Sequence, residues 1–426
     1  MQKAKGKRAA RAGLTQTNPG SPHREERVKR QCQLLLPFDL CLLTFAFALF
    51  LLSALGFAQE PKPYAAINRD AVNYHGPGRD TGHDMTGAEV RMGLLLPLAG
   101  PRQAEGEALR RGAQIAVDEE NASSLPGGNR LLLVARDESG PWGQDSAQIV
   151  HMVFDDQAVA LITSAEGGAA HLAEQVGNKI GVPVLTLSTD GTTTEINLPW
   201  IFRVGPTDTA QARAFARDIY QNRKLRRVVL LTQDDRDGRL GSEEFAKAAR
   251  ELNAAAPTRI AVEPGEFPEE MVWRQLATAQ AAVIWTDAAT AHRLAAGVRE
   301  LQPTVPLYLC RKAAQGDSSE ESQPPCPPCG HNDANQWIAA APENREVWAG
   351  FYERYRLRFG AEPGIGAAEA YDAVRILAAA LRQSGPNRTR LRDALAGIST
   401  FNGASGVISF DHAGNNTSQV TLLKLK

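Results

Sequence analysis

From Val90 onward, short runs of leucine and β-branched residues alternate with amphipathic stretches that are long enough for helices. Apolar residues fill whole strands instead of every second position, which is typical of parallel strands covered by helices on both faces. The pattern therefore predicts an α/β fold. The expected strands are 90–97, 131–135, 158–163, 182–187, 227–232, 281–285 and 305–309. The expected helices are 106–121, 144–154, 169–180, 209–222, 242–252 and 290–301.

Three further segments of the second half have recognisable patterns. Residues 406–410 and 419–423 flank a turn at 412–415, which predicts a C-terminal β-hairpin. Residues 313–335 are polar and rich in Ser, Glu and Pro, so we expect an exposed loop there. Apolar residues three or four positions apart predict one buried helix face, formed by Ala370, Val374, Leu377 and Leu381.

The first 58 residues differ from the rest of the chain in charge and hydropathy. Nine basic residues precede the uncharged run Leu40–Ala58, and Gly56 and Ala58 are small residues at the positions that cleavage requires. This arrangement is typical of a secretory signal peptide, although an apolar run of this length can also remain in the membrane as an anchor. We expect cleavage after Ala58, an exported body, and an extended arm over residues 59–89.

Charge and motifs exclude several classes of function. Residues 1–58 hold nine basic and three acidic residues, which leaves 38 basic and 45 acidic residues and a formal charge of −7 in the body. An acidic body without a basic stripe argues against nucleic acid as a partner. The motifs HExxH, GxSxG and GxxxxGK are absent from the sequence. We therefore expect no catalytic residues and no cofactor.

The body contains three cysteines, Cys310, Cys326 and Cys329. A Cys-x-x-Cys pair can be a redox centre, half of a zinc site or a small disulfide. The segments around Cys326 and Cys329 provide neither the preceding strand nor the helix N-terminus that lowers a thiol pKa. His331 and Cys310 can complete a zinc set only across an unpatterned loop. We favour a structural disulfide between Cys326 and Cys329 and expect no metal.

Eight blocks are spread along the body in this order: RMGLLLPLAG (91–100), GAQIAVDEEN (112–121), GVPVLTLST (181–189), IFRVGPTDTAQA (201–212), RVVLLTQDD (227–235), FYERYRLRFGAEPG (351–364), AEAYDAVRILAAAL (368–381) and GVISFDHAGN (406–415). Together they resemble the type I periplasmic binding proteins, typified by the leucine/isoleucine/valine-binding receptors of ABC importers. The resemblance implies two Rossmann-like lobes joined by three crossovers, near Pro206, Ala341 and Ser405. It also implies a ligand cleft between the lobes, at the carboxyl ends of the strands.

The resemblance also implies how the chain is divided between the lobes. The first lobe would consist of residues 90–206 and 342–405. The second lobe would consist of residues 207–341, including the exposed loop, and of the C-terminal hairpin 406–426.

The resemblance places ligand-binding residues at the loops that follow the strands. The matching positions in the first lobe are Glu105, Ser164, Gly167, Gly168, Ser188, Thr189 and Asp190, and those in the second lobe are Asp237, Asp287 and Lys312. The N–H groups of Gly167 and Gly168 can bind an anion at a helix N-terminus, or the glycines can serve a tight turn. Lys312 stands where amino-acid binders of the family carry an acid for the ligand ammonium, and Asp237 replaces an aromatic residue.

These departures keep the fold signature but not the amino-acid pocket. The sequence therefore predicts a solute-binding receptor of an ABC importer, with a membrane permease as partner and no chemistry of its own. Its ligand would be a small polar or anionic metabolite contacting Lys312 instead of a branched-chain amino acid, unless it binds none. Two alternatives stay open: a ligand-sensing subunit for a membrane signalling receptor, and a thiol–disulfide protein that uses Cys326 and Cys329.

Overall fold

The computed structural model describes residues 86–123, 128–140, 143–195, 198–263, 274–315, 336–340 and 344–424, all within the compact unit Lys62–Lys426. The predicted signal peptide, the arm as far as residue 85, and the expected Cys326–Cys329 disulfide lie outside the described residues. Within those residues, no helix is both long enough and apolar enough to cross a membrane.

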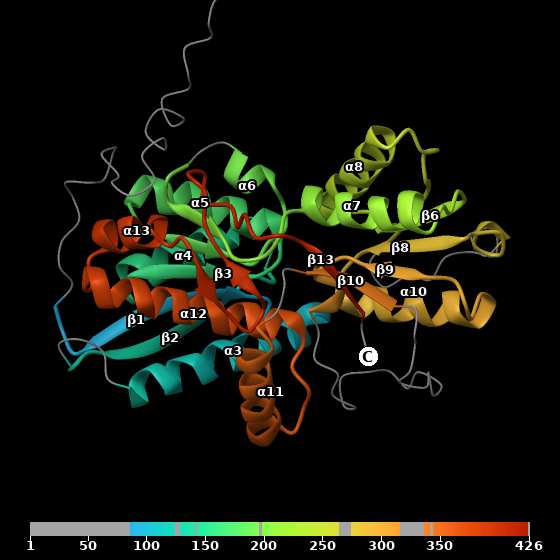
Figure 1. The fold of residues 1–426 in the computed structure, drawn as a ribbon. Helices are drawn as coiled ribbons and strands as arrows, with labels where there is room; N and C mark the ends of the chain where they lie inside the picture. Colours follow the sequence, from blue (N-terminus) through green and yellow to red (C-terminus); the bar gives the residue numbers. More distant parts are fainter. Residues whose placement is uncertain are drawn as a thin grey trace, which may run out of the picture. The chain divides into compact units, whose positions relative to one another are not determined.

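Five parallel strands form the first sheet, in the order β2-β1-β3-β4-β5 (Figure 1). Their bounds are β1 Glu89–Leu96, β2 Arg130–Asp137, β3 Ala160–Thr163, β4 Val184–Thr186 and β5 Ile201–Arg203. Leu94 and Leu96 of β1 are buried in one apolar cluster, and Leu95 between them is buried in another. The sheet is therefore covered on both faces, which confirms the α/β prediction.

Helices from distant parts of the sequence cover this first sheet. The elements are η2 Gly100–Arg102, α3 Gln103–Ala122, α4 Gln144–Phe154, α5 Gly167–Ile180, α6 Thr192–Glu195, α11 Arg345–Phe359, α12 Ile365–Ser384 and α13 Arg388–Ala396. Helices α3 and α12 contribute to the cluster that holds Leu94, whereas α4 and α5 contribute to the cluster that holds Leu95. The predicted apolar face of α12 is buried throughout. We call this sheet with its helices the first lobe.

Six strands form the second sheet, in the order β13-β10-β9-β8-β6-β7, and only β13 runs antiparallel to its neighbour. The strands are β6 Val228–Gln233, β7 Thr258–Val262, β8 Ala281–Trp285, β9 Leu307–Leu309, β10 Gln336–Ala340 and β13 Thr421–Lys424. The helical elements are α7 Asp208–Ala216, η4 Arg217–Asn222, α8 Arg236–Glu251, α10 Ala288–Leu301 and η5 Lys312–Ala314. A separate apolar cluster forms the core of this second lobe.

The chain passes between the lobes after β5, after β10 and before β13. The structure places the third passage later than Ser405, because Ile408 and Phe410 are buried in the core of the first lobe. Residues 406–410, the first arm of the hairpin that was predicted for the second lobe, therefore belong to the first lobe.

The C-terminal hairpin forms only next to its turn, where Phe410 and Asn416 make an isolated antiparallel bridge, and the predicted pairing of 406–410 with 419–423 is wrong. The turn itself exists, since the Asp411 N–H donates to the Asn415 carbonyl over 2.9 Å. However, β12 (Val407–Ile408) pairs with β11 (Phe401–Asn402), while β13 pairs with β10 of the second sheet. The two arms separate because each buries its apolar side chains in a different core.

The start of the expected exposed loop at Ala313 is also wrong. Ala313 is buried in the second core beside Cys310, and Gln315 is buried as well. The chain continues from β9 into the short η5 turn before it reaches the residues outside the described ranges. This extension matters for function because it holds Lys312 inside the protein.

Candidate functional site

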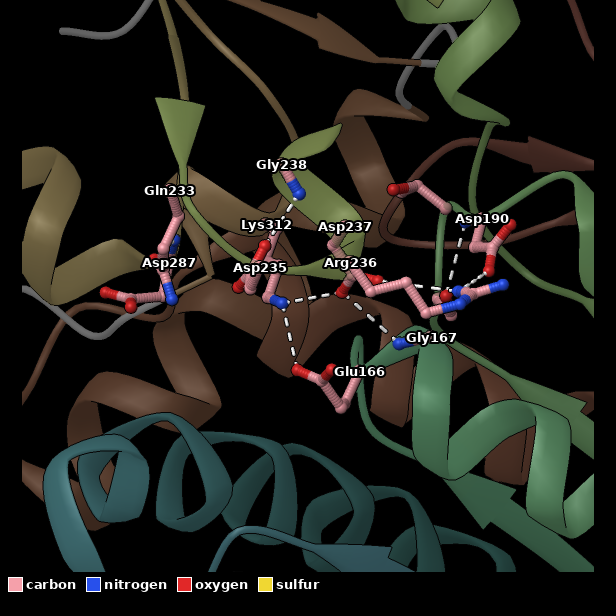
Figure 2. A network of polar contacts seen from close by, with 12 residues as sticks. Glu166, Gly167, Asp190, Gln233, Asp235, Arg236, Asp237, Gly238, Asp287 and Lys312 are labelled. Carbon is pink, nitrogen blue, oxygen red and sulfur yellow. Dashed lines mark hydrogen bonds and ion pairs between the residues drawn. The ribbon is translucent and has the colours of Figure 1, made fainter. Parts of the chain in front are cut away.

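Charged side chains gather at the carboxyl ends of the strands, where loops of both lobes contact one another (Figure 2). Glu166 and Asp190 come from the loops after β3 and β4 of the first lobe, and Gly167 is the first residue of α5. Arg236 and Asp237 begin α8 directly after β6. Lys312 completes the group from η5, after β9. Four of the residues proposed from the sequence, Gly167, Asp190, Asp237 and Lys312, are thus brought together.

Lys312 is a buried cation that joins the two lobes. Its Nζ donates to Asp237 Oδ2 over 2.7 Å and to Glu166 Oε2 over 3.0 Å, and the residue is only 6% exposed. Burial lowers the pKa of Lys312, but the charges of Asp237 and Glu166 reverse this effect and raise it well above its usual range. The charge of the Lys312 ammonium lowers the pKa of Glu166 to about 2, although burial acts in the opposite direction. Lys312 is therefore charged and already balanced by two carboxylates.

Asp237 lies between this cation and the first lobe. It is 7% exposed, and its Oδ2 also accepts a hydrogen bond from the Gly167 N–H, over 3.3 Å. Burial raises the pKa of Asp237, whereas the Lys312 charge opposes that rise. Asp235 caps α8 by accepting from the Gly238 N–H over 2.7 Å, so the helix start holds Asp237 in this position.

Glu105 belongs to a second ionic cluster, around Arg102. Arg102 donates to Glu105 over 2.7 Å, and its Nη1 lies 3.0 Å from Glu166 and 3.5 Å from Glu138. Burial raises the pKa of Glu138 to about 8, although Arg102 and the Ser164 hydroxyl lower it. Ser164 donates to Glu138 over 2.6 Å. Sequence analysis missed Arg102 and Glu138, although both follow predicted strands closely.

Asp190 is held by groups from both lobes. Arg236 of the second lobe donates to its Oδ2, and the Thr192 hydroxyl donates to its Oδ1 over 2.7 Å. Burial raises the pKa of Asp190, but hydrogen bonds from His171, Thr192 and Arg236 outweigh burial and place it below its usual range. Two basic partners, His171 and Arg236, thus balance the charge of this carboxylate, and sequence analysis identified neither of them.

His171 joins Asp190 to a second carboxylate, Glu174. The ring nitrogens lie 3.4 Å from Asp190 Oδ2 and 3.2 Å from Glu174 Oε2. Hydrogen bonds to Asp190 and then to Glu174 raise the pKa of His171 to about 9, against the smaller effect of burial. His171 is therefore protonated at neutral pH and carries a positive charge.

A His171→Gln variant should show a flatter pH dependence of stability than the unmodified protein. The folded pKa lies above the ordinary value of about 6.5, so the contribution of His171 is complete below that pH and is lost as the pH rises through 9. Between pH 6 and pH 10 the unmodified protein should lose about 1–2 kcal/mol more than the variant. Urea unfolding at a series of pH values measures this difference. Parallel profiles would contradict the assignment.

The remaining proposed residues mainly organise loops. Asp287 caps α10, since its Oδ1 accepts from the Thr290 N–H over 2.7 Å. The Thr189 hydroxyl donates to Asp208 over 2.6 Å, which ties the loop after β4 to α7. Ser188 Oγ accepts from the Asp190 N–H over 3.2 Å. Near Gly168, a Cβ would meet only Glu166, at 3.9 Å.

The described residues contain no group of three His, Cys, Asp or Glu side chains arranged to hold a metal ion. Cys310 is a buried free thiol whose Sγ lies 3.7 Å from the Thr286 carbonyl oxygen. Burial raises the pKa of this thiol to about 12, so it is not a reactive thiolate at neutral pH.

The comparisons with known proteins agree on one family. The sequence model described as "periplasmic binding protein" matches residues 89–426. The Leu/Ile/Val-binding protein BraC3 of Rhizobium johnstonii is 29% identical over 183 residues, which cover 42% of this chain and 49% of BraC3. The match thus spans about half the length of that curated relative.

Solved structures extend the likeness in fold over most of the body. The branched-chain amino acid transporter substrate-binding protein LivJ from Streptococcus pneumoniae, in complex with isoleucine, has a TM-score of 0.68 and 21% identity, over 79% of this chain and 96% of LivJ. An ABC transporter solute-binding protein from R. palustris, in complex with benzoate, has a TM-score of 0.69 and 18% identity, over 79% and 93%.

Proposed function

The chain belongs to the periplasmic binding protein family, and on that premise we propose that it is the substrate-binding component of an ABC importer. In this proposal it is exported, holds a small polar solute between its lobes and presents the closed lobes to a membrane permease. The family consists of solute-binding proteins and not of enzymes, and the structural neighbours named above are substrate-binding proteins of ABC transporters.

The meeting of charged loops from both lobes is the observation that carries the proposal. Ligands of parallel α/β sheets bind outside the carboxyl ends of the strands. At that place Lys312 and Asp237 of one lobe contact Glu166 and Gly167 of the other. Lobes connected by short crossovers can rotate as bodies, and a solute that contacts both favours the closed arrangement. The loops are thus positioned to respond to a bound solute.

The side chains at this place support a polar solute. The two neighbours hold isoleucine and benzoate, each an apolar group with a carboxylate. Here the loops instead bring together the charged side chains of Asp190, Asp237 and Lys312. Because Lys312 is paired with two carboxylates, its charge gives weak support for an anionic ligand. Neutral or cationic polar solutes are therefore the proposed class.

A thermal-shift screen of small solutes, followed by calorimetric titration, tests this function. We expect a neutral or cationic polar solute to stabilise the protein, by about 2.7 kcal/mol at a concentration of 100 times its Kd. Leucine, isoleucine and valine should not bind at micromolar concentration. Micromolar binding of any of the three that is unaffected by Lys312→Ala would contradict the proposed ligand class. A broad panel without any stabilising solute would count against the binding function itself.

A further inference from the structure

We propose that Asp237 is a built-in carboxylate that occupies the anion-binding position at the start of α5 and so excludes solute carboxylates from it. The inference rests on the proposed function and gives a physical reason for its solute class. It concerns a specificity residue on the second lobe that acts at a backbone site on the first lobe.

The first part of the site is the N-terminus of α5, a helix of fourteen residues. The N-terminal N–H groups and the helix dipole attract negative charge. The side chain of Glu166, which precedes the helix, makes no capping hydrogen bond. Instead, the Gly167 N–H donates to Asp237 Oδ2 over 3.3 Å. The carboxylate at this helix start thus comes from the opposite lobe.

The second part of the site is the ammonium of Lys312. Its Nζ lies 2.7 Å from the same Oδ2 atom, so one oxygen accepts from both a helix N–H and a buried cation (Figure 2). Asp237 Oδ1 is buried and has no hydrogen bond with the described residues. These two donors, the N–H and the ammonium, can bind the carboxylate of a free solute as well as they bind that of Asp237. Asp237 therefore fills the role that an anionic ligand group would otherwise take.

The third part is the space beside Gly167. A Cβ at this residue would lie 2.6 Å from Asp237 Oδ1, 2.7 Å from Arg236 Nη1 and 2.9 Å from Asp190 Oδ2. The space beside Gly167 is thus occupied by the ends of three charged side chains, which come from both lobes. A second carboxylate placed here would meet Asp190 and Asp237 at short range. Repulsion of this kind provides specificity against acidic solutes.

Chemical rescue tests the assignment. Asp237→Ala removes the carboxylate and leaves the Gly167 N–H and Lys312 facing a space of its size, so formate should bind there. We expect formate, compared with chloride at equal ionic strength, to raise the melting temperature of Asp237→Ala in a saturable manner. Its apparent affinity should exceed that for the unmodified protein at least about tenfold.

Matched variants separate this effect from general salt stabilisation. Asp237→Asn fills the same space without a charge and should not respond to formate. Asp237→Ala combined with Lys312→Met lacks the cation and should lose the response. Asp237→Gly with acetate, which replaces the whole side chain, repeats the test in a second background in case Asp237→Ala does not fold.

Equal formate responses of the unmodified protein and Asp237→Ala would overturn the proposal, as would the absence of rescue in both the alanine and the glycine backgrounds. The experiment needs no natural solute. A failed rescue would therefore leave the solute screen of the preceding section standing, and a screen without a hit would leave a positive rescue standing.

Discussion

Replacing Glu369 with alanine should lower the free energy of unfolding by about 3–5 kcal/mol. Glu369 lies in α12 of the first lobe, and its Oε1 accepts from Nε of Arg311, which follows β9 of the second lobe, over 3.0 Å. Both side chains are 1% exposed. The substitution leaves a guanidinium buried without its counterion at a point where the lobes are joined, and such a charge is costly.

A double variant, Arg311→Met with Glu369→Leu, is the matched control for this prediction. Replacement of a buried ion pair by apolar side chains of similar volume is often neutral or stabilising, so the double variant should regain most of the lost stability. Urea unfolding followed by circular dichroism provides the comparison. The ion-pair explanation would be wrong if the double variant were as unstable as Glu369→Ala.

Gly112→Ala should destabilise the protein by about 2–4 kcal/mol, although alanine favours helices over glycine by about 1 kcal/mol. Gly112 lies in α3 where this helix crosses α12. A Cβ there would lie 2.0 Å from the Ala367 carbonyl oxygen and 2.7 Å from its carbon. These are backbone atoms, so the two helices must move apart to admit a methyl group. Thermal and urea unfolding measure the loss.

Gly350→Ala is the control for the glycine substitution. Gly350 lies in the middle of α11, and the nearest atom to its Cβ position is Arg354 Nη1 at 3.0 Å, the end of a flexible side chain. The helix preference for alanine should therefore dominate, with a change of at most about 1 kcal/mol in the stabilising direction. If both substitutions had the same effect, the close helix crossing at Gly112 would not be the cause.

The sequence contained enough information for many elements of the fold, although it did not predict helices such as α11 and α13. Strands such as Ala281–Trp285 and helices such as Gln144–Phe154 were predicted with the bounds that the structure has. Each depends on the spacing of apolar residues along a short stretch, which is local information. The strands β5, β7, β10 and β11 were not predicted. Strands β5 and β11 have only three and two residues, which carry no measurable period, and β7 is largely exposed, so its sequence lacks an apolar run. The family was also recognisable, from blocks spread over the whole body.

The loops that carry the site were likewise predictable, since the carboxyl ends of parallel strands meet at one edge of a sheet. On these loops, the resemblance to the family indicated Gly167, Asp190, Asp237 and Lys312, which the structure brings together. It did not predict that Thr189 and Asp287 serve as partners within loops and helix caps. The local sequence does not distinguish a carboxylate that faces a ligand from one that caps a helix.

Only the tertiary structure decided which charges meet. Lys312 pairs with Glu166 and Asp237, which are 146 and 75 positions away in the chain, and Arg236 reaches Asp190 from the other lobe. The sequence suggested that Lys312 is a cation available to an anionic ligand. In the structure its ammonium is paired with two carboxylates of the same chain. Ion pairing depends on distances of a few ångströms between groups on separate sheets. Apolar periodicity determines each sheet by itself, but it carries no information on those distances.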